Sequence, residues 1–423
     1  MKHSSAFHSG HERLIQLLED QRTEMVEFLQ ALLRCQTPNP PGDTRSAMEL
    51  VRTFLNRRGL HFEEVTAKET MPNLVAGFDG SRDGPHLVMN GHIDVFPVGA
   101  AEKWEHDPWA AVIVENRIVG RGACDMKSGT TALLFAYAAL SEMREDVSGR
   151  LTLTVVSDEE TFGPHGSRHL LAARPDLRGD CMLSTEPTSP RAMRYGEKGP
   201  LWLRFDVETR GAHSAYAHMS PNAIQIVSEI VRDLAVLCEL QTEGTQALAR
   251  DLAKHGDTID AAYGNGASDI IAKVTINPAL VHGGVKINMI PSHCSFDVDV
   301  RVPPGMDDRT VLDAVDSLIR DRAGVRYSVL HYDAPNVSPV DHPMIDIMRA
   351  NAKKVSGVEP APIIGLGATD ARLWRQVGVP AFVYGPSPRN MGTANEYVKI
   401  DEFMHVAKVH ALSALDFLGF EEG

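Results

Sequence analysis

Residues that could bind a metal ion recur through the first half of the chain. They are the segment His92-Ile93-Asp94, Asp125, the pair Glu159-Glu160, and Glu186. Asp158, Glu159 and Glu160 are consecutive acids, which are costly to bury unless a cation compensates their charge. One imidazole with several carboxylates is a ligand set suited to zinc, manganese or cobalt. These residue types therefore favour a site for a divalent metal.

Most of these candidate ligands follow an apolar run that is typical of a β-strand. His92 comes just after the run 86–89, and Glu159 follows the run 151–157. Ligand sites in open α/β sheets lie beyond the carboxyl ends of strands. We expect Asp94 to accept the second ring N–H of His92 and so orient the imidazole. Taken alone, each residue also fits a structural role, such as a helix cap for Asp125.

Strand-like and helical patterns alternate around these residues. Helices are predicted over 11–33, 46–58 and 130–143, and strands over 73–78, 86–89, 111–114 and 151–157. The same alternation resumes late in the chain, with a helix over 344–355, a strand over 381–384 and a helix from Asp401. We predict an α/β fold with a central, mostly parallel sheet and flanking helices.

The stretch 199–334 has a different pattern. It predicts strands over 201–209, 270–277, 295–302 and 326–332, helices over 222–240 and 307–322, and a loop near 255–268. This β-α-β-β-α-β order is that of a ferredoxin-like α+β sandwich. We therefore predict an inserted domain over 199–334, between two parts of a catalytic domain over 1–198 and 335–423.

Composition excludes several classes of protein. The net charge of −14 and the absence of a basic run argue against nucleic-acid binding. Five cysteines without a C-x-x-C pair fit reduced thiols rather than a disulfide framework. No apolar stretch reaches the ~18–20 residues that span a bilayer, and residues 1–20 lack the pattern of a signal peptide. We expect a cytoplasmic protein without a membrane partner.

A series of ordered motifs makes the chain similar to one enzyme family. They are Gly91-His92-Ile93-Asp94, Gly120-Arg121-Gly122, Asp125-Met126-Lys127, Glu159-Glu160, Gly211-Ala212-His213-Ser214, Gly283-Gly284, Asn288-Met289-Ile290-Pro291, Gly367-Ala368-Thr369-Asp370-Ala371-Arg372 and Asn395-Glu396-Tyr397-Val398. The chain resembles the two-metal aminoacyl hydrolases, the family of acetylornithine deacetylase, succinyl-diaminopimelate desuccinylase, aminoacylase and glutamate carboxypeptidase. The resemblance spans nearly the whole chain.

The resemblance implies a role for each candidate ligand. His92, Asp125 and Glu186 would hold a first metal ion, and Asp125 would bridge toward a second ion that Glu160 also binds. Glu159 would be the general base, which takes a proton from water and passes it to the leaving nitrogen. Asp94 would orient the His92 imidazole without binding the metal itself.

The resemblance also implies roles for the inserted domain, as a lid and as the surface of a homodimer. His213 would stabilise the tetrahedral oxyanion, in some members of the family from across the dimer. Asn288 and Arg301 would bind a substrate carboxylate, a task that suits the paired donors of Arg. Arg301 fits a surface charge at a strand end equally well.

The chain departs from the family at its last motif. The histidine that binds the second metal is expected three residues before Asn395, where this chain has Gly392. Possible substitutes nearby are Asn390, Thr393, Glu396 and His405. With Asp125 and Glu160 alone, a second ion would be held weakly, so we expect one tightly bound ion.

These observations lead to one main hypothesis and two alternatives. The main hypothesis is a metal-dependent hydrolase of an amide in a small, carboxylate-bearing molecule such as an N-acyl amino acid or dipeptide. The first alternative is a mononuclear aminohydrolase that releases ammonia from an amino-substituted acid. The second, motivated by Gly392, is an inactive relative that acts as a binding protein.

Overall fold

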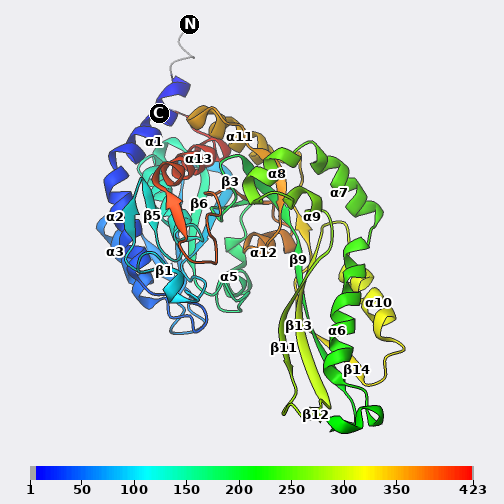
Figure 1. Cartoon of the computed structure of the whole chain (residues 1–423). Coiled ribbons are helices and arrows are strands. Elements are labelled where there is room, and N and C mark those ends of the chain that lie inside the picture. The colour runs from blue at the N-terminus through cyan, green and yellow to red at the C-terminus, as the bar shows by residue number, and fades with distance from the viewer. Residues whose placement is uncertain (1–5, 422–423) are drawn as a thin grey trace. The chain divides into compact units, whose positions relative to one another are not determined.

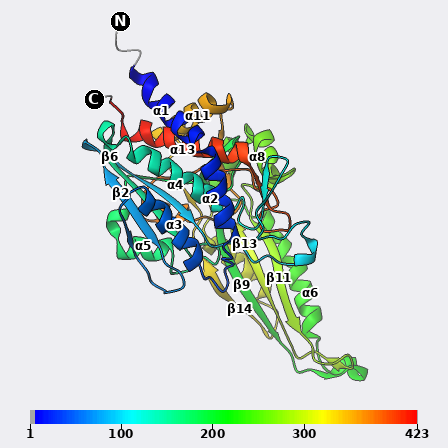
Figure 2. The ribbon, with the colours of Figure 1, turned by 90° about the vertical axis from the view of Figure 1, so that its left-hand side faces the viewer.

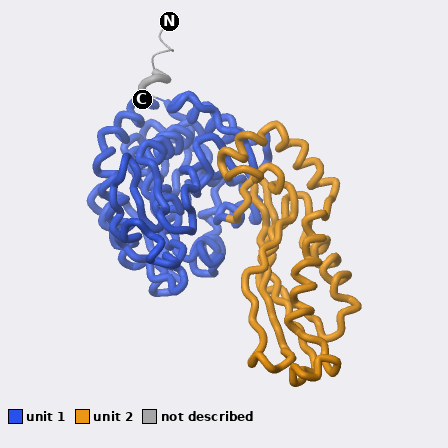
Figure 3. Tube along the Cα trace, in the orientation of Figure 1, with its two compact units in different colours: residues 1–195, 338–363, 369–423 blue, residues 196–337, 364–368 orange. Residues whose placement is uncertain are grey.

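The computed structural model describes residues 6–421, with side chains from Gly10 onward, and divides into two compact units. Unit 1 contains residues 1–195, 338–363 and 369–423, and unit 2 contains 196–337 and 364–368 (Figure 3). The predicted insertion, 199–334, falls within unit 2. The first five residues of the segment 1–20, where no signal peptide is expected, lie outside the described residues.

The main sheet of unit 1 has parallel strands at its centre. Its central strands are β6 (Ser148–Val156), β3 (Arg82–His92), β7 (Cys181–Ser184) and β17 (Ala381–Val383), in that order. Neighbours among these four run parallel. Antiparallel pairing adds β2 (Leu74–Asp79) and β1 (Phe62–Glu64) at one side and β8 (Ala192–Glu197) at the other. The α/β prediction is therefore confirmed, and the sheet is mixed, with a parallel centre.

Helices cover both faces of this sheet. On one face, α4 (Lys127–Ser141) and α13 (Ile400–Leu418) contact β3 and β6. All residues of α4 are buried, which explains its nearly uniform small and apolar sequence. On the other face, α5 (Ser167–Ala173) and α12 (Ala371–Gln376) pack on β7 and β17 through a core that includes Trp374. These two layers bury the parallel strands and leave their carboxyl ends for a site.

Further elements surround this core of unit 1. They are α1 (Ala6–Asp20), α2 (Arg22–Arg34), α3 (Arg45–Arg57), α11 (Pro343–Ser356) and a small sheet of β4 (Val112–Val114), β5 (Arg117–Val119) and β18 (Tyr397–Lys399). Strand β16 (Ala361–Gly365) pairs with β8 in the main sheet. Figure 2 shows α1, α2 and α3 along the side of the unit that faces the viewer. The helix predicted over 11–33 is two helices, α1 and α2, separated at Gln21.

Unit 2 contains the predicted ferredoxin-like sandwich. Its long strands are β9 (Gly199–Glu208), β11 (Thr275–Gly283), β13 (His293–Val302) and β14 (Val325–Tyr332), and all neighbours are antiparallel in the order β11-β13-β9-β14. The helices α6 (Ala223–Asp233) and α10 (Asp308–Ile319) pack on this sheet (Figure 1). Phe205 and Phe296 stack in its core with ring centroids 4.7 Å apart. Short elements complete the unit: β10 (Ala212–His213), β12 (Met289–Ile290) and β15 (Asn336–Val337).

The structure corrects the sequence prediction between α6 and β11. The helix predicted over 222–240 ends at Asp233 and continues as the 3-10 helix η5 (Leu234–Glu239). Three helices follow, α7 (Glu243–Ala253), α8 (Gly256–Tyr263) and α9 (Ala267–Ile270). No element was predicted over α7, and α8 and the start of α9 lie where a loop near 255–268 was predicted. The predicted strand 270–277 consequently starts later, at Thr275. The prediction was wrong because glycines at 264 and 266 interrupt the helical pattern, and they serve as helix boundaries rather than as a loop.

Among residues 6–421, no helix is both long enough and apolar enough to cross a membrane.

Two buried histidines on α13 make the stability of unit 1 sensitive to acid. His405 contacts the Tyr384 hydroxyl at 2.7 Å, and His410 contacts the Tyr384 carbonyl oxygen at 2.7 Å. Burial lowers the pKa of each imidazole to about 4, and Lys408 adds to the effect at His405. The unfolded chain takes up protons below pH ~6.5, whereas these folded groups do so only near pH 4.

We therefore expect the free energy of unfolding to fall as the pH drops from 6.5 toward 4, by up to about 3 kcal/mol for each histidine. Urea unfolding at pH 7, 6 and 5 measures this fall. His410→Gln should reduce the pH dependence, whereas His61→Gln, at an exposed position, should not. Identical pH dependence in wild type and His410→Gln would contradict the prediction.

Candidate metal centre

The strand register of unit 1 brings the candidate ligands to one edge of the sheet. β3 ends at His92, which lies opposite Val156 at the end of β6, and Asn90 lies opposite Ser184 at the end of β7. The chain therefore delivers Glu159 and Glu186 a few residues beyond the carboxyl ends of adjacent strands. The acid Asp125 arrives at the same place from the loop before α4. This is the edge at which the sequence predicted a site.

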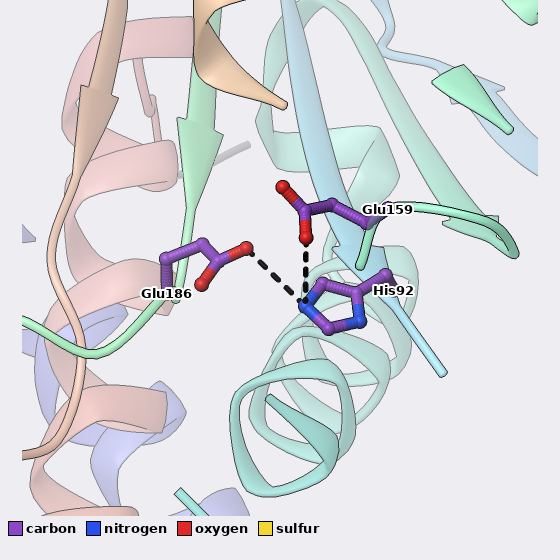
Figure 4. Close-up of side chains that lie close together, drawn as sticks. All are labelled: His92, Glu159 and Glu186. Carbon is purple, nitrogen blue, oxygen red and sulfur yellow. Dashed lines mark ion pairs between the residues drawn. The ribbon is translucent and has the colours of Figure 1, made fainter. Parts of the chain in front are cut away.

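The imidazole of His92 lies at the centre of a group of carboxylates. Its Nε2 atom is 3.3 Å from Glu186 Oε1, 3.4 Å from Asp125 Oδ1 and 3.9 Å from Glu159 Oε2. Figure 4 shows Glu159 and Glu186 directed at this nitrogen. His92, Glu159 and Glu186 are all buried.

Two sets of donor atoms in this group could each hold a metal ion. One set is His92, Glu159 and Glu186, and the other is His92, Asp125 and Glu160; within each set the donors lie within 4.8 Å of one another. The second set is the more exposed one, because Asp125 and Glu160 are only partly buried. The structure thus brings together all five residues predicted to be ligands or the general base. The predicted first site contained His92, Asp125 and Glu186, whereas each of the two donor sets groups His92 with other residues as well.

Asp94 holds the imidazole and the acidic pair at the same time. The His92 Nδ1 atom lies 2.9 Å from the Asp94 carbonyl oxygen and 3.4 Å from its carboxylate. That carboxylate also accepts the backbone N–H groups of Glu159 at 3.3 Å and Glu160 at 3.2 Å. Its position fits the predicted orientation of His92 and adds a second contact, with the backbone of the acidic pair.

Sequence analysis missed Asn39. Its amide Nδ2 donates to Asp94 Oδ2 at 2.8 Å and to Asp158 Oδ1 at 3.0 Å, and the side chain is buried. The surrounding prolines, Pro38, Pro40 and Pro41, predict only the end of a helix. No local pattern could have identified Asn39, because its partners lie 55 and 119 residues away.

Arg372 supplies positive charge beside the predicted general base. It is 1% exposed, and its Nη1 atom lies 3.7 Å from Glu159 Oε1 and 3.9 Å from Asp370 Oδ1. The guanidinium also lies over the Phe162 ring, 4.7 Å from its centroid. Sequence analysis singled out the motif that contains Arg372 but gave the residue no role.

Burial and mutual repulsion make the acids hard to ionise in the absence of a cation. Burial raises the pKa of Glu159 and of Glu160 well above the ordinary value, and the neighbouring acids Glu186 and Asp125 add to the effect. Burial and Asp125 raise the pKa of Glu186 to about 7. Burial alone would lower the pKa of His92, but Asp125, Asp94 and Glu186 raise it well above 6.5.

The residues fit a divalent cation. His92 Nε2, Glu159 Oε1 and Glu160 Oε1 are buried atoms that lack a hydrogen-bond partner within the described chain. Buried polar atoms in proteins nearly always have a partner, so these three are suited to an ion or to the water beside it. Imidazole nitrogen and carboxylate oxygen are ligands that zinc, manganese and cobalt accept. Such a centre can activate water and polarise a carbonyl.

The structure shows what surrounds Gly392, where the family's second-metal histidine is expected. The possible substitutes all have partners within the protein. Asn390 donates to the Asn395 carbonyl at 2.9 Å, and Thr393 donates to the Asn390 carbonyl at 3.0 Å. Glu396 binds Arg121 and backbone N–H groups, and His405 contacts Tyr384.

The three remaining candidates lie in unit 2. His213 and Asn288 are close together, because β10 and β12 pair and Ser214 N–H donates to the Asn288 carbonyl at 3.0 Å. His213 is exposed, and its Nδ1 accepts the Ala215 N–H at 3.2 Å. Arg301 is partly buried on β13 and donates twice to Asp299 Oδ2, at 2.9 and 3.0 Å. The Arg301 guanidinium is therefore paired within its own strand.

Asn288 and Arg301 lie at opposite ends of β13. Asn288 precedes His293, where the strand begins, whereas Arg301 pairs with Pro200 and Thr275 near its other end. At about 3.3 Å per residue, the strand from His293 to Arg301 spans about 26 Å. Within one chain the two residues cannot contact the same small carboxylate.

Comparisons with known proteins identify the family of the chain. The model of peptidase family M20/M25/M40 matches residues 88–416. Succinyl-diaminopimelate desuccinylase 2 of Ruegeria sp. (strain TM1040) is 27% identical over 408 residues, which cover 94% of this chain and 95% of the relative.

Solved structures share the fold. An M20 family metallo-carboxypeptidase from Sulfolobus solfataricus, Sso-CP2, superposes with a TM-score of 0.75 at 21% identity, over 93% of this chain and 98% of the other. A dinuclear metal binding peptidase of the M20 family from Bacillus subtilis superposes with a TM-score of 0.66 at 13% identity, over 95% of this chain and 99% of the other.

Proposed function

The chain belongs to peptidase family M20/M25/M40 and is a metal-dependent amide hydrolase, and we propose that its substrate is a small N-acyl amino acid or dipeptide-like molecule that bears a carboxylate. The observation that carries this proposal is the group of buried acids around His92 Nε2, with polar atoms that lack partners. A desuccinylase among the relatives supports an acyl amino acid as substrate. The relatives lend no support to the ammonia-releasing alternative or to an inactive binding protein.

We take the roles of the residues from the family resemblance, and the convergence of these side chains around His92 supports them. A bound divalent cation supplies a Lewis acid for the scissile carbonyl and for the attacking water. His92, Asp125 and Glu186 would hold this ion. Glu159 accepts a proton from the attacking water and delivers it to the leaving nitrogen. Glu159 Oε1 is a buried atom without a hydrogen-bond partner within the described chain, so it is available to take a proton and release it again.

We expect one tightly held ion, which is zinc, manganese or cobalt. Gly392 has no side chain to donate, and each possible substitute nearby already has a partner in the protein. A second ion would rely on Asp125 and Glu160, which are partly exposed. Fewer protein ligands give weaker binding, so the second ion is expected to exchange readily.

We propose a homodimer formed through unit 2. Strand β11 is at an edge of its sheet and, with the loop that follows, exposes the aliphatic residues Leu280, Val281, Val285 and Ile287. Val285 and Ile287 are 91% and 99% exposed, which is unfavourable in water and suits an interface. A second copy would also supply His213 and Asn288 to a substrate held by Arg301, since one chain cannot present both ends of β13 to it.

The hydrolysis reaction can be tested with a substrate panel. With zinc, manganese or cobalt added, wild type should release a carboxylic acid from N-acyl amino acids, or free amino acids from dipeptides. Glu159→Gln should lower kcat by about 10²- to 10⁴-fold while the ion stays bound, because the general base is lost. Glu145→Gln, on the surface, is the control. Ammonia release without a carboxylic acid product, or undiminished turnover in Glu159→Gln, would contradict the proposal.

The number of ions can be measured by metal analysis after dialysis. Wild type should retain one ion per chain, and His92→Ala should retain none. His86→Ala, a change on the same strand, should retain it, because the His86 imidazole hydrogen-bonds Thr152 and belongs to neither set of donor atoms. Gly392→His should raise the number toward two: a Cβ at this position meets no atom within 4 Å, although its φ of +70° costs some backbone strain. Two tightly held ions in wild type would refute the single-ion assignment.

The contribution of a second copy can be tested by mixing two variants. Glu159→Gln lacks the general base, and His213→Ala lacks the oxyanion donor, so each alone should be nearly inactive. When the two variants are co-expressed with separate tags, half of the dimers contain one chain of each variant. In such a dimer, one of the two active sites is complete. Activity should therefore return to about a quarter of wild type. If the mixture is no more active than its parts, His213 does not act across a dimer.

A further inference from the structure

A buried ion pair joins the loop before Asp125 to the loop that contains Gly392. Arg121 and Glu396 are 1% and 0% exposed, and Arg121 Nη1 donates to Glu396 Oε2. Arg121 Nη2 also donates to the Thr393 carbonyl at 3.1 Å. The Gly120 N–H donates to the Glu396 carbonyl oxygen at 2.9 Å. These contacts connect two loops that are 275 residues apart in the chain.

The other carboxylate oxygen of Glu396 binds the backbone at Asp125 itself. Glu396 Oε1 accepts the Cys124 N–H at 2.9 Å and the Asp125 N–H at 3.2 Å. Both oxygens are therefore engaged inside the protein, and Glu396 belongs to neither set of donor atoms around His92. Glu396, one of the possible substitutes for the missing histidine, contacts the centre through the backbone of a ligand instead.

The loop before Asp125 needs such an anchor. It contains Gly120 and Gly122, and Gly122 has a φ of +85°, which only glycine adopts without strain. Glycine residues lose more conformational freedom on ordering than others, so this backbone depends on its contacts to stay in place. Partners of this kind, one step removed from the metal, orient the ligands and commonly contribute 10- to 100-fold to metal affinity.

We infer that Glu396 is a positioning residue for Asp125: it fixes the backbone that presents this carboxylate to the metal, and Arg121 holds Glu396 in place. The inference rests on the proposed function, in which Asp125 is a metal ligand. It gives the motif Asn395-Glu396-Tyr397-Val398 a structural role at the metal centre that does not require a histidine at position 392. A charged partner is needed because the buried Arg121 would otherwise be left without its anion.

The test measures Co²⁺ affinity by chelator competition and the visible spectrum of the Co²⁺-loaded protein. Glu396→Gln should weaken Co²⁺ binding by about 10- to 100-fold and alter the spectrum. Glu402→Gln is the matched control, because Glu402 also accepts a backbone N–H at 2.9 Å, and this N–H is that of Ser387, outside the Asp125 loop. Its affinity and spectrum should equal those of wild type.

A double variant separates positioning from a general loss of structure. If Glu396 acts through Asp125, then Asp125→Asn and the double variant Asp125→Asn/Glu396→Gln should bind Co²⁺ equally weakly. Additive losses would overturn the inference, and so would unchanged affinity in Glu396→Gln. Unchanged affinity in Asp125→Asn would instead contradict the proposed ligand set, on which the inference depends. Should Glu396→Gln not fold, Arg121→Lys replaces it, and an unchanged affinity and spectrum there would overturn the inference.

Discussion

The repulsion among buried acids around His92 is the constraint on which the rest of unit 1 depends. Glu159, Glu160, Glu186 and Asp125 converge on one imidazole, and burial raises the pKa of the three glutamates. Such a group is stable when a cation compensates its charge, so the arrangement that is unfavourable for the empty protein is what gives it affinity for a metal. Metal binding and the stability of this edge of the sheet are therefore linked.

The protein holds this unfavourable group with a surrounding layer of fixed partners. Asp94 and Asn39 hold the imidazole and the acidic pair on one side. Glu396 holds the Asp125 backbone on another. These contacts fix the positions of the candidate ligands, so less ordering is left to occur when an ion binds. The glycine at position 392 leaves these contacts intact, which supports the proposal of one tightly held ion.

Much of the fold could be predicted from local pattern. The strands that end near His92 and Val156 are apolar runs, and α4 is a continuous stretch of small and apolar residues. The sandwich of unit 2 follows from alternating strands and two amphipathic helices. The helices α7, α8 and α9 were missed because glycine boundaries hide short helices whose stability comes from packing. The break at Gln21 was missed because the apolar spacing continues across it.

The sequence by itself determined which residues can bind a metal, and it placed most of them after the ends of strands. Residue type and hydrophobic periodicity are local properties, so both can be read from the sequence. Resemblance along the chain then indicated the enzyme family, and family membership was confirmed. Only the tertiary structure decided that Asn39 binds Asp94 and Asp158, that Glu396 binds the backbone at Cys124 and Asp125, that every possible substitute for the missing histidine has another partner, and that Asn288 and Arg301 lie toward opposite ends of β13. These facts depend on contacts between residues that are distant in the chain, and no local pattern encodes such contacts.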